Sequence, residues 1–269
     1  MVETKSVEIV DITPDKSVWE KFGKSGYSFS TAMAELIDNS ITAIQEYKIK
    51  KPNLKEPLKI YIYIDKEKHK QTEQINITDE GCGMTYEVAK KALILGKSSW
   101  TIKSLGEFGI GMKASCSALG KKYTILTTSE GDNNVYKYVH DEEEWRKQSK
   151  WQEQLYKETK DDKKEHSTSV IISNLKKPIG PQKINNLKVD FAKRYQAFIK
   201  NKEIEILING QSIVPEEQIL SYGPINFDIT LNSGNKIYGW YGLLKEGSDT
   251  GYYGFETYKK GKMIKCYEK

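Results

Sequence analysis

The spacing of apolar residues in the first part of the chain predicts one long helix, a set of strands and a second helix. Residues 31–47 carry apolar side chains at helical spacing, and Ser30 stands at the position of an N-cap. Stretches rich in β-branched and aromatic residues predict strands, and residues 86–95 predict a further helix. The predicted strands cover residues 58–64, 74–78, 123–128, 135–140 and 168–173.

A cluster of lysine, glycine and proline over residues 176–181 separates a second block from the first. The pattern beyond it predicts a helix at 185–200, followed by strands at 204–208, 227–231, 236–244, 252–258 and 263–267. Helices interleaved with a mixed sheet predict an α+β chain of two domains, residues 1–177 and 178–269. Between two strands of the first block, the highly charged residues 141–166 predict a surface helix or loop.

Composition and charge exclude several classes of protein. The chain is 38% hydrophobic and 29% charged with a mean hydropathy of −0.64, and no apolar run reaches the roughly 20 residues of a membrane span. Three cysteines and three histidines are scattered, which argues against zinc sites and disulfides and favours a cytoplasmic location. The net charge is +5, which is compatible with non-specific binding to DNA. Only two of the 42 basic residues are arginines, the residue that best recognises base edges, so sequence-specific DNA recognition is disfavoured.

The first segment with candidate chemistry lies on the long predicted helix. At the helical angle of 100° per residue, Glu35, Asp38, Asn39 and Thr42 gather opposite the apolar face. Such residues are by default the wet side of an amphipathic helix. The alternative is that Glu35 and Asn39 point together into a cleft, where a carboxylate can deprotonate a water molecule and a carboxamide oxygen can bind Mg²⁺.

The second segment, residues 75–84, is a strand that runs into an acidic residue and two glycines. A tight turn between strand and helix would explain Gly81 and Gly83 without any ligand. Alternatively, the missing Cβ atoms let a flat ring approach the backbone. Asp79 would then accept a hydrogen bond from an exocyclic amine, and Met84 would pack on the face of the ring.

The third segment, residues 106–115, is a glycine-rich turn that leads into a helix near Met112. It matches neither the dinucleotide-binding fingerprint nor the P-loop. Glycine-rich backbone at the start of a helix still supplies N–H groups and a positive dipole end for an anion, and Lys113 would add a charge.

In this order, the three segments resemble the GHKL nucleotide-binding family, which includes gyrase B, the ninety-kilodalton heat-shock chaperones, histidine kinases and MutL proteins. The resemblance covers about residues 15–177 and implies a Bergerat-type α/β sandwich, a mixed sheet with helices on one face. Residues 93–113 look most like the microrchidia (MORC) branch. More loosely, the second block resembles the transducer domain of MutL and MORC proteins, on residues 193–195, 208–210, 239–244 and 254–262. That domain looks cut short at Lys269, as in a piece of a longer protein.

The resemblance implies an ATP-binding and slowly hydrolysing switch. Glu35 would be the general base, Asn39 would hold Mg²⁺, and Asp79 with Met84 would hold adenine, with Thr168 beside them. The implied nucleotide contacts are Asn39, Asp79, Gly81, Gly83, Met84, Gly106, Phe108, Gly109, Ile110, Gly111, Met112, Lys113 and Thr168.

The resemblance also implies a lid over residues 96–111, which closes over the triphosphate and favours an ATP-dependent homodimer. Lys97 and Lys103 are candidate phosphate contacts. DNA is the first candidate for the partner that a closed dimer would bind. Two positions carry no implied role: Thr42 stands where family members often have an acid, and the family tolerates many residues at the position of Cys82.

Three alternatives stay open. A histidine kinase needs a phosphoacceptor histidine upstream of the first segment, but only 34 residues precede Glu35 and none is a histidine. A heat-shock chaperone would have a larger middle domain than the short second block provides. A module that binds ATP without hydrolysing it is disfavoured by the presence of Glu35.

Overall fold

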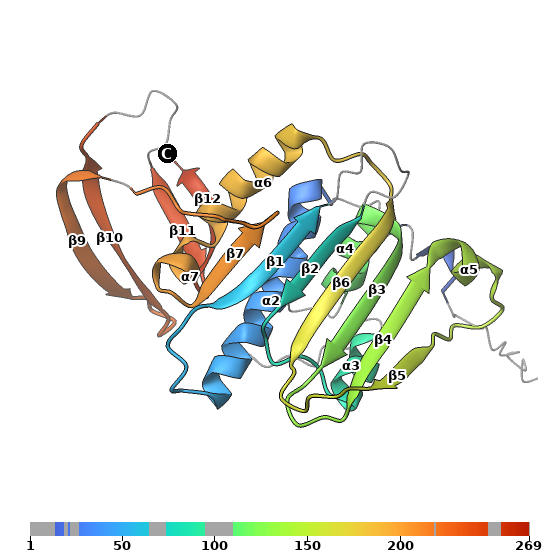
Figure 1. The fold of residues 1–269 in the computed structure, drawn as a ribbon. Coiled ribbons are helices and arrows are strands. Elements are labelled where there is room, and N and C mark those ends of the chain that lie inside the picture. The colour runs from blue at the N-terminus through green and yellow to red at the C-terminus, as the bar shows by residue number, and fades with distance from the viewer. Residues whose placement is uncertain are drawn as a thin grey trace, which may run out of the picture.

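The computed structural model describes residues 14–18, 21, 27–64, 74–94, 110–217, 219–246 and 254–268, without the side chains of 266–268. Its largest part is an eight-stranded sheet with the strand order β5-β4-β3-β6-β2-β1-β7-β8 (Figure 1). Neighbours are antiparallel except β1 and β7, which are parallel. The strands are β1 (Leu58–Ile64), β2 (Ile75–Asp79), β3 (Gly120–Thr128), β4 (Asn134–Asp141), β5 (Leu155–Thr159), β6 (Ser167–Leu175), β7 (Ile204–Ile208) and β8 (Gln211–Ser212).

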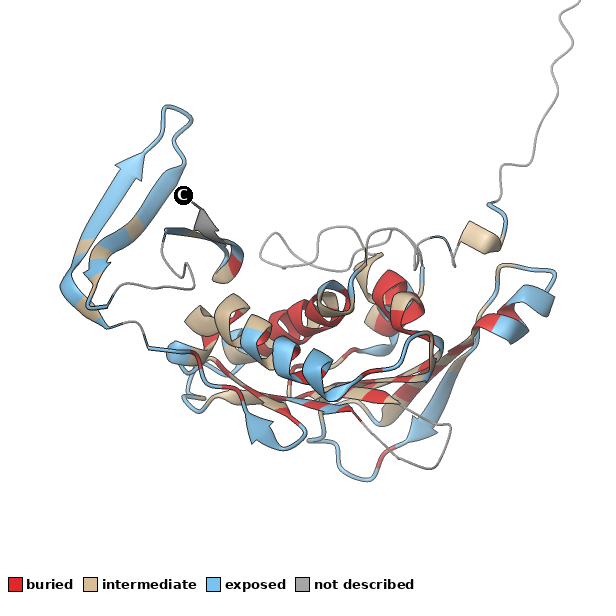
Figure 2. Cartoon of the chain, turned by 90° about the horizontal axis from the view of Figure 1, so that it is seen from above, coloured by how far each residue is buried: buried red, intermediate tan, exposed pale blue. Residues whose placement is uncertain are grey.

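The helices cover one face of this sheet (Figure 2). They are α2 (Phe29–Lys50), α3 (Tyr86–Ala92), α4 (Gly111–Leu119), α5 (Glu142–Lys147), α6 (Pro181–Arg194) and α7 (Gln196–Lys200). The alternation in β1 shows why only one face is covered, because Ile60 and Ile62 are buried while Tyr61 and Tyr63 are exposed. The predicted α/β sandwich, a mixed sheet with helices on one face, is confirmed.

Helix α2 is longer than predicted and more deeply buried. Its N-cap is Ser28, whose Oγ accepts a hydrogen bond from the Thr31 N–H, and the prediction of Ser30 as the cap was wrong. Ser30 instead donates its hydroxyl to Asp190 of α6. The interpretation of a wet face was also wrong for Asp38 and Thr42, which are buried because other helices pack around α2.

The charged segment 141–166 holds both the helix α5 and a strand, β5, which the sequence did not predict. Most of the β5 side chains are exposed, as expected for a charged strand at the edge of a sheet. The helix predicted at 185–200 is divided at Tyr195 into α6 and α7. Strands β7 and β8 lie beyond residue 178 and extend the same sheet, so the sheet crosses the predicted domain boundary. The division into two domains stays a prediction.

Two hairpins complete the chain. The first pairs β9 (Leu220–Thr230) with β10 (Lys236–Leu244), and the second pairs β11 (Phe255–Lys259) with β12 (Lys262–Glu268). Lys260 and Gly261 join β11 to β12 with φ values of 54° and 81°, the positive values of a tight two-residue turn. The second hairpin contacts α6 and α7. No helix within the described ranges is long and apolar enough to cross a membrane.

Candidate functional site

Glu35 and Asn39 lie one turn apart on α2, beside the start of α4. The side-chain nitrogen of Asn39 donates to the main-chain oxygen of Glu35 at 2.9 Å, which leaves the carboxamide oxygen as the group able to bind a ligand. The Glu35 carboxylate lies against Gly111, where a Cβ atom would come 2.5 Å from Oε2. Burial raises the pKa of Glu35, as does the charge of Asp38, whereas Lys262 and Arg194 act to lower this pKa.

Asp79 ends β2 and lies in register with Thr168 of β6, which is itself in register with Thr127 of β3. Side chains at paired positions share a face of the sheet, so the three form a row across three strands. The hydroxyl oxygens of Thr127 and Thr168 are 3.0 Å apart. The structure therefore brings the predicted pair of Asp79 and Thr168 together and adds Thr127, which the sequence showed only as a strand residue.

The Asp79 carboxylate is buried and receives donors from its own chain. Ser40 donates its hydroxyl to Oδ2 at 3.0 Å, and the Gly81 N–H donates to Oδ1 at 2.9 Å. Burial nevertheless raises the pKa of Asp79 to about 7. The carboxyl group can therefore change its protonation near neutral pH, which is unusual for an aspartate.

The two glycines after Asp79 are required by the packing of the chain itself. A Cβ atom on Gly81 would lie 2.6 Å from the Cβ atom of Ala43 on α2. Gly83 has a φ of 60°, and a Cβ atom there would overlap the carbonyl oxygen of Thr128. Packing against α2 and β3 therefore explains both glycines, and the close approach of a ring stays a prediction.

Met84 and Met112 meet at a small apolar pocket under α3. The Met84 N–H donates to the Thr127 hydroxyl at 2.9 Å, which links this pocket to the row that contains Asp79. The pocket is lined by Met84, Ala89, Ala92, Leu93, Met112, Ile125, Thr127, Tyr136, Tyr138 and Leu155. Apolar walls beside a few polar groups are typical of small-molecule sites.

The start of α4 has the properties of an anion site. Its N-cap Ile110 makes no side-chain cap, and the Lys113 side chain is buried, with no hydrogen-bond partner for Nζ among the described residues. Burial lowers the pKa of Lys113 to about 8. A buried ammonium without a partner is unfavourable, so these residues fit a phosphate group, which would supply the missing charge.

Part of the predicted glycine-rich loop lies outside the described residues. This holds for Gly106, Phe108 and Gly109, and for the candidate phosphate contacts Lys97 and Lys103.

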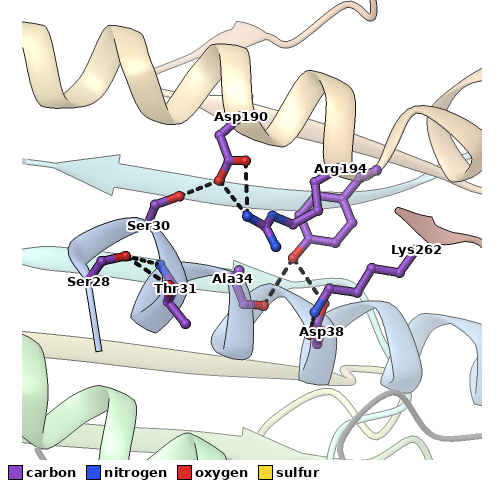
Figure 3. A network of polar contacts seen from close by, with 9 residues as sticks. Ser28, Ser30, Thr31, Ala34, Asp38, Asp190, Arg194 and Lys262 are labelled. Atoms are coloured by element: carbon purple, nitrogen blue, oxygen red, sulfur yellow. Dashed lines mark hydrogen bonds and ion pairs between the residues drawn. The ribbon is translucent and has the colours of Figure 1, made fainter. Parts of the chain in front are cut away.

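A network of polar contacts around Asp38 was not predicted (Figure 3). Asp38 accepts a hydrogen bond from the Tyr195 hydroxyl at 3.0 Å and forms an ion pair with Lys262 at the start of β12. Burial raises the pKa of Asp38, while Lys262 and Tyr195 act to lower this pKa. The partners lie more than 150 residues away in the sequence, so no local pattern could reveal the network.

Comparisons with known proteins agree with this geometry. The profile of the family described as "Histidine kinase-, DNA gyrase B-, and HSP90-like ATPase" matches residues 27–172. The chain is also similar to the human MORC family CW-type zinc finger protein 1, with 30% identity over 102 residues. That alignment covers 37% of this chain and 9% of the human protein.

The mixed sheet with helices on one face is the α/β sandwich of an ATP-binding family. The chain belongs to the family of histidine kinase-, DNA gyrase B- and HSP90-like ATPases, because the match covers more than half of it. The predicted GHKL membership and the predicted MORC resemblance are both confirmed, and the chain carries an ATP-binding ATPase module.

Proposed function

We propose that this chain hydrolyses ATP slowly in the presence of Mg²⁺, with Glu35 as the general base. The observation that carries the proposal is the meeting of α2 and α4, where the Glu35 carboxylate lies against the first residue of α4. The same helix carries the buried Lys113 ammonium, for which the described residues offer no partner. A base and a phosphate site would thus lie side by side.

The nucleotide would extend between the two ends of this site. Asp79 and Met84 would hold adenine, with Gly81, Gly83 and Thr168 forming the walls beside it. Asn39 would bind Mg²⁺ through its carboxamide oxygen, and Lys113 would contact the phosphates. The other implied phosphate contacts are Gly106, Phe108, Gly109, Ile110, Gly111 and Met112.

Each residue has a distinct chemical task. Burial raises the pKa of Glu35, and a carboxylate with a raised pKa is a better acceptor for the proton of the attacking water. Lys113 and the N–H groups at the start of α4 would offset negative charge on the phosphates without needing to reorganise. Mg²⁺, when bound, supplies charge neutralisation at the phosphate oxygens.

The test is ATP turnover with and without Mg²⁺, measured on the wild-type chain and on Glu35→Ala. Loss of turnover in Glu35→Ala with unchanged nucleotide affinity is the expected result. Glu35→Gln serves as the matched variant, since it keeps the shape of the side chain but cannot accept the proton. Nucleotide binding without turnover in the wild-type chain would instead identify a binding-only module, and absence of binding would refute the proposal.

We propose further that ATP closes a lid over residues 96–111 and favours a homodimer, which could act as a clamp on DNA. The support is the similarity to the MORC protein and the net charge of +5. Light scattering with a non-hydrolysable ATP analogue tests the dimer. A salt titration of DNA binding with and without that analogue tests the clamp, and an affinity that does not respond to nucleotide would reject it.

A further inference from the structure

The ion pair between Lys262 and Asp38 joins two distant parts of the chain within one turn of the proposed base on α2. Asp38 is 2% exposed and lies three residues after Glu35 on α2. Lys262 is the first residue of β12, and its side chain is 17% exposed. The contact is therefore largely shielded from water, where an ion pair is screened much less than at the surface.

The hairpin that carries Lys262 is itself held in place. A Cβ atom on Gly261 would lie 2.8 Å from the ring of Phe198, so the turn rests directly on α7. Gln196 of α7 donates its side-chain amide to Glu256 of β11 at 3.1 Å, and Met263 is buried next to Lys262. Lys262 therefore reaches α2 from a docked hairpin.

The position of Asp38 controls which way Glu35 and Asn39 point. At 100° per residue, Glu35 lies about 60° and Asn39 about 100° to the same side of Asp38, so the three side chains share one sector of about one turn of α2. Tyr195 strengthens the hold, because its hydroxyl lies 3.0 Å from both Asp38 Oδ1 and the Ala34 carbonyl oxygen. Fixing Asp38 thus fixes the rotation of this turn of α2.

We propose that Lys262 is a positioning residue of the ATPase site, which couples the docking of the β11–β12 hairpin to the orientation of Glu35 through Asp38. This inference rests on the proposed role of Glu35. When the hairpin moves away, Asp38 keeps a buried charge with one partner fewer, and this turn of α2 loosens. The C-terminal part of the chain thereby controls turnover through Asp38 and α2.

The test compares kcat, KM and nucleotide affinity in variants of the full chain. Lys262→Met keeps the aliphatic stem but removes the charge, so we expect kcat to fall about tenfold or more while KM and Kd stay within about twofold. Lys262→Arg keeps the charge and should restore kcat to within about threefold of wild type. Lys236→Met is the matched control, because Lys236 forms an exposed pair with Asp228 on β9. An unchanged kcat in Lys262→Met, or equal losses of affinity and kcat, would overturn the proposal.

A second variant separates positioning from folding. Lys262→Met alone leaves the Asp38 carboxylate buried without its ion-pair partner, which lowers stability. The double variant Asp38→Asn with Lys262→Met removes that charge, so stability should recover while kcat stays low because the link to the hairpin is still missing. Recovery of kcat together with stability would show that Lys262 acts on folding alone.

Hydrogen exchange tests the coupling without any turnover. In Lys262→Met, exchange of the peptide over residues 34–42 should accelerate at least about fivefold more than exchange of a peptide from β3 and β4, which reports the change in global stability. Unchanged exchange at 34–42 would overturn the proposal even if Glu35→Ala abolishes turnover. If the wild-type chain shows no turnover but residues 34–42 still exchange faster in Lys262→Met than in wild type, the proposed role of Glu35 is wrong and the coupling of the hairpin to α2 stands.

Discussion

The Lys113 side chain is buried, although burial is unfavourable for its positive charge. Its Nζ has no hydrogen-bond partner in the part of the chain that the structure describes, and burial lowers its pKa to about 8. Such an arrangement weakens the protein unless it serves a ligand, because a buried ammonium gives up its hydration without recovering hydrogen bonds. Stability and nucleotide binding should therefore respond in opposite directions when this charge is removed.

The first prediction follows from that opposition. Lys113→Met should raise the free energy of unfolding of the nucleotide-free chain by roughly 1–3 kcal/mol and should weaken ATP binding by about tenfold or more. Thermal unfolding and calorimetric titration measure the two effects. Lys122→Met is the control, since Lys122 of β3 forms a partly exposed ion pair with Asp141, and it should change neither quantity. A Lys113→Met chain that is less stable without nucleotide would contradict the prediction.

The pKa of Lys113 adds a dependence on pH. Because the pKa is about 8 in the folded chain and 10.5 ordinarily, the destabilisation is fully present below pH 8 and is relieved as the pH rises toward 10.5. ATP binding should reverse the shift, so binding near pH 8 to 9 should take up a proton. Calorimetry in buffers of different ionisation enthalpy measures this uptake, and Lys113→Met should lack it.

Asp79 shows the opposite pH dependence. Its pKa is raised from 3.8 to about 7, so its contribution to stability is fully present below pH 4 and is lost as the pH rises to 7. The loss amounts to roughly 4 kcal/mol at 1.4 kcal/mol per pKa unit. Denaturant unfolding at pH 5 and pH 8 should show this slope in wild type but not in Asp79→Asn. Equal slopes in the two proteins would mean that Asp79 is charged throughout.

At the scale of elements, the contact between α2 and α4 depends on the absence of one side chain. Gly111 begins α4, and a Cβ atom there would meet only the end of the Glu35 side chain, which can swing away. Gly81 has a similar contact about two turns further along α2, but its added Cβ atom would meet the backbone of Ala43 at 2.9 Å. Substitution of Gly111 and of Gly81 by alanine should therefore have different effects on activity and on stability.

Gly111→Ala should preserve stability or raise it by up to about 1 kcal/mol, because alanine favours helix more than glycine does. Turnover should still fall about tenfold or more, since the displaced Glu35 carboxylate no longer faces the start of α4. Gly81→Ala should instead destabilise the fold by roughly 1–3 kcal/mol through overpacking. Chemical unfolding and kcat, measured on both variants, distinguish the two, and a Gly111→Ala chain with full activity would count against the proposed site.

The elements also show how far the sequence could predict the molecule. The periodicity of α2 and the alternation of β1 are local patterns, so both elements and the apolar face of α2 could be predicted. The burial of Asp38 and Thr42 could not be predicted, because it depends on the other helices that pack around α2. The pairing of Asp79 with Thr168 followed only from the family resemblance, because strand register is not a local property. Ser28 caps α2 in place of Ser30 because Asp190 of α6 accepts the Ser30 hydroxyl, a contact between residues 160 positions apart.

At the scale of the whole molecule, both hairpins consist of two antiparallel strands, but they differ in their contacts with the rest of the protein. Most of the β9–β10 hairpin is exposed and none of its strand residues is buried (Figure 2); Tyr238 and Leu243 are among the exposed residues. The β11–β12 hairpin contacts α6 and α7 and is tied to α2 by Lys262. A two-stranded hairpin is only marginally stable in water by itself, so contacts with the rest of the protein must decide how long each hairpin stays formed.

We therefore expect three levels of amide protection in the native chain. Amides of β3 and β6, in the middle of the eight-stranded sheet, should exchange only by global unfolding. Amides of β9 and β10 should exchange fastest among the strands, and those of β11 and β12 should be intermediate. Lys262→Met should lower the protection of β11 and β12 toward that of β9 and β10, because it removes the charged contact with α2. Equal protection of the two hairpins in wild type would show that packing on α7 and the ion pair with Asp38 do not hold the second hairpin to the rest of the molecule.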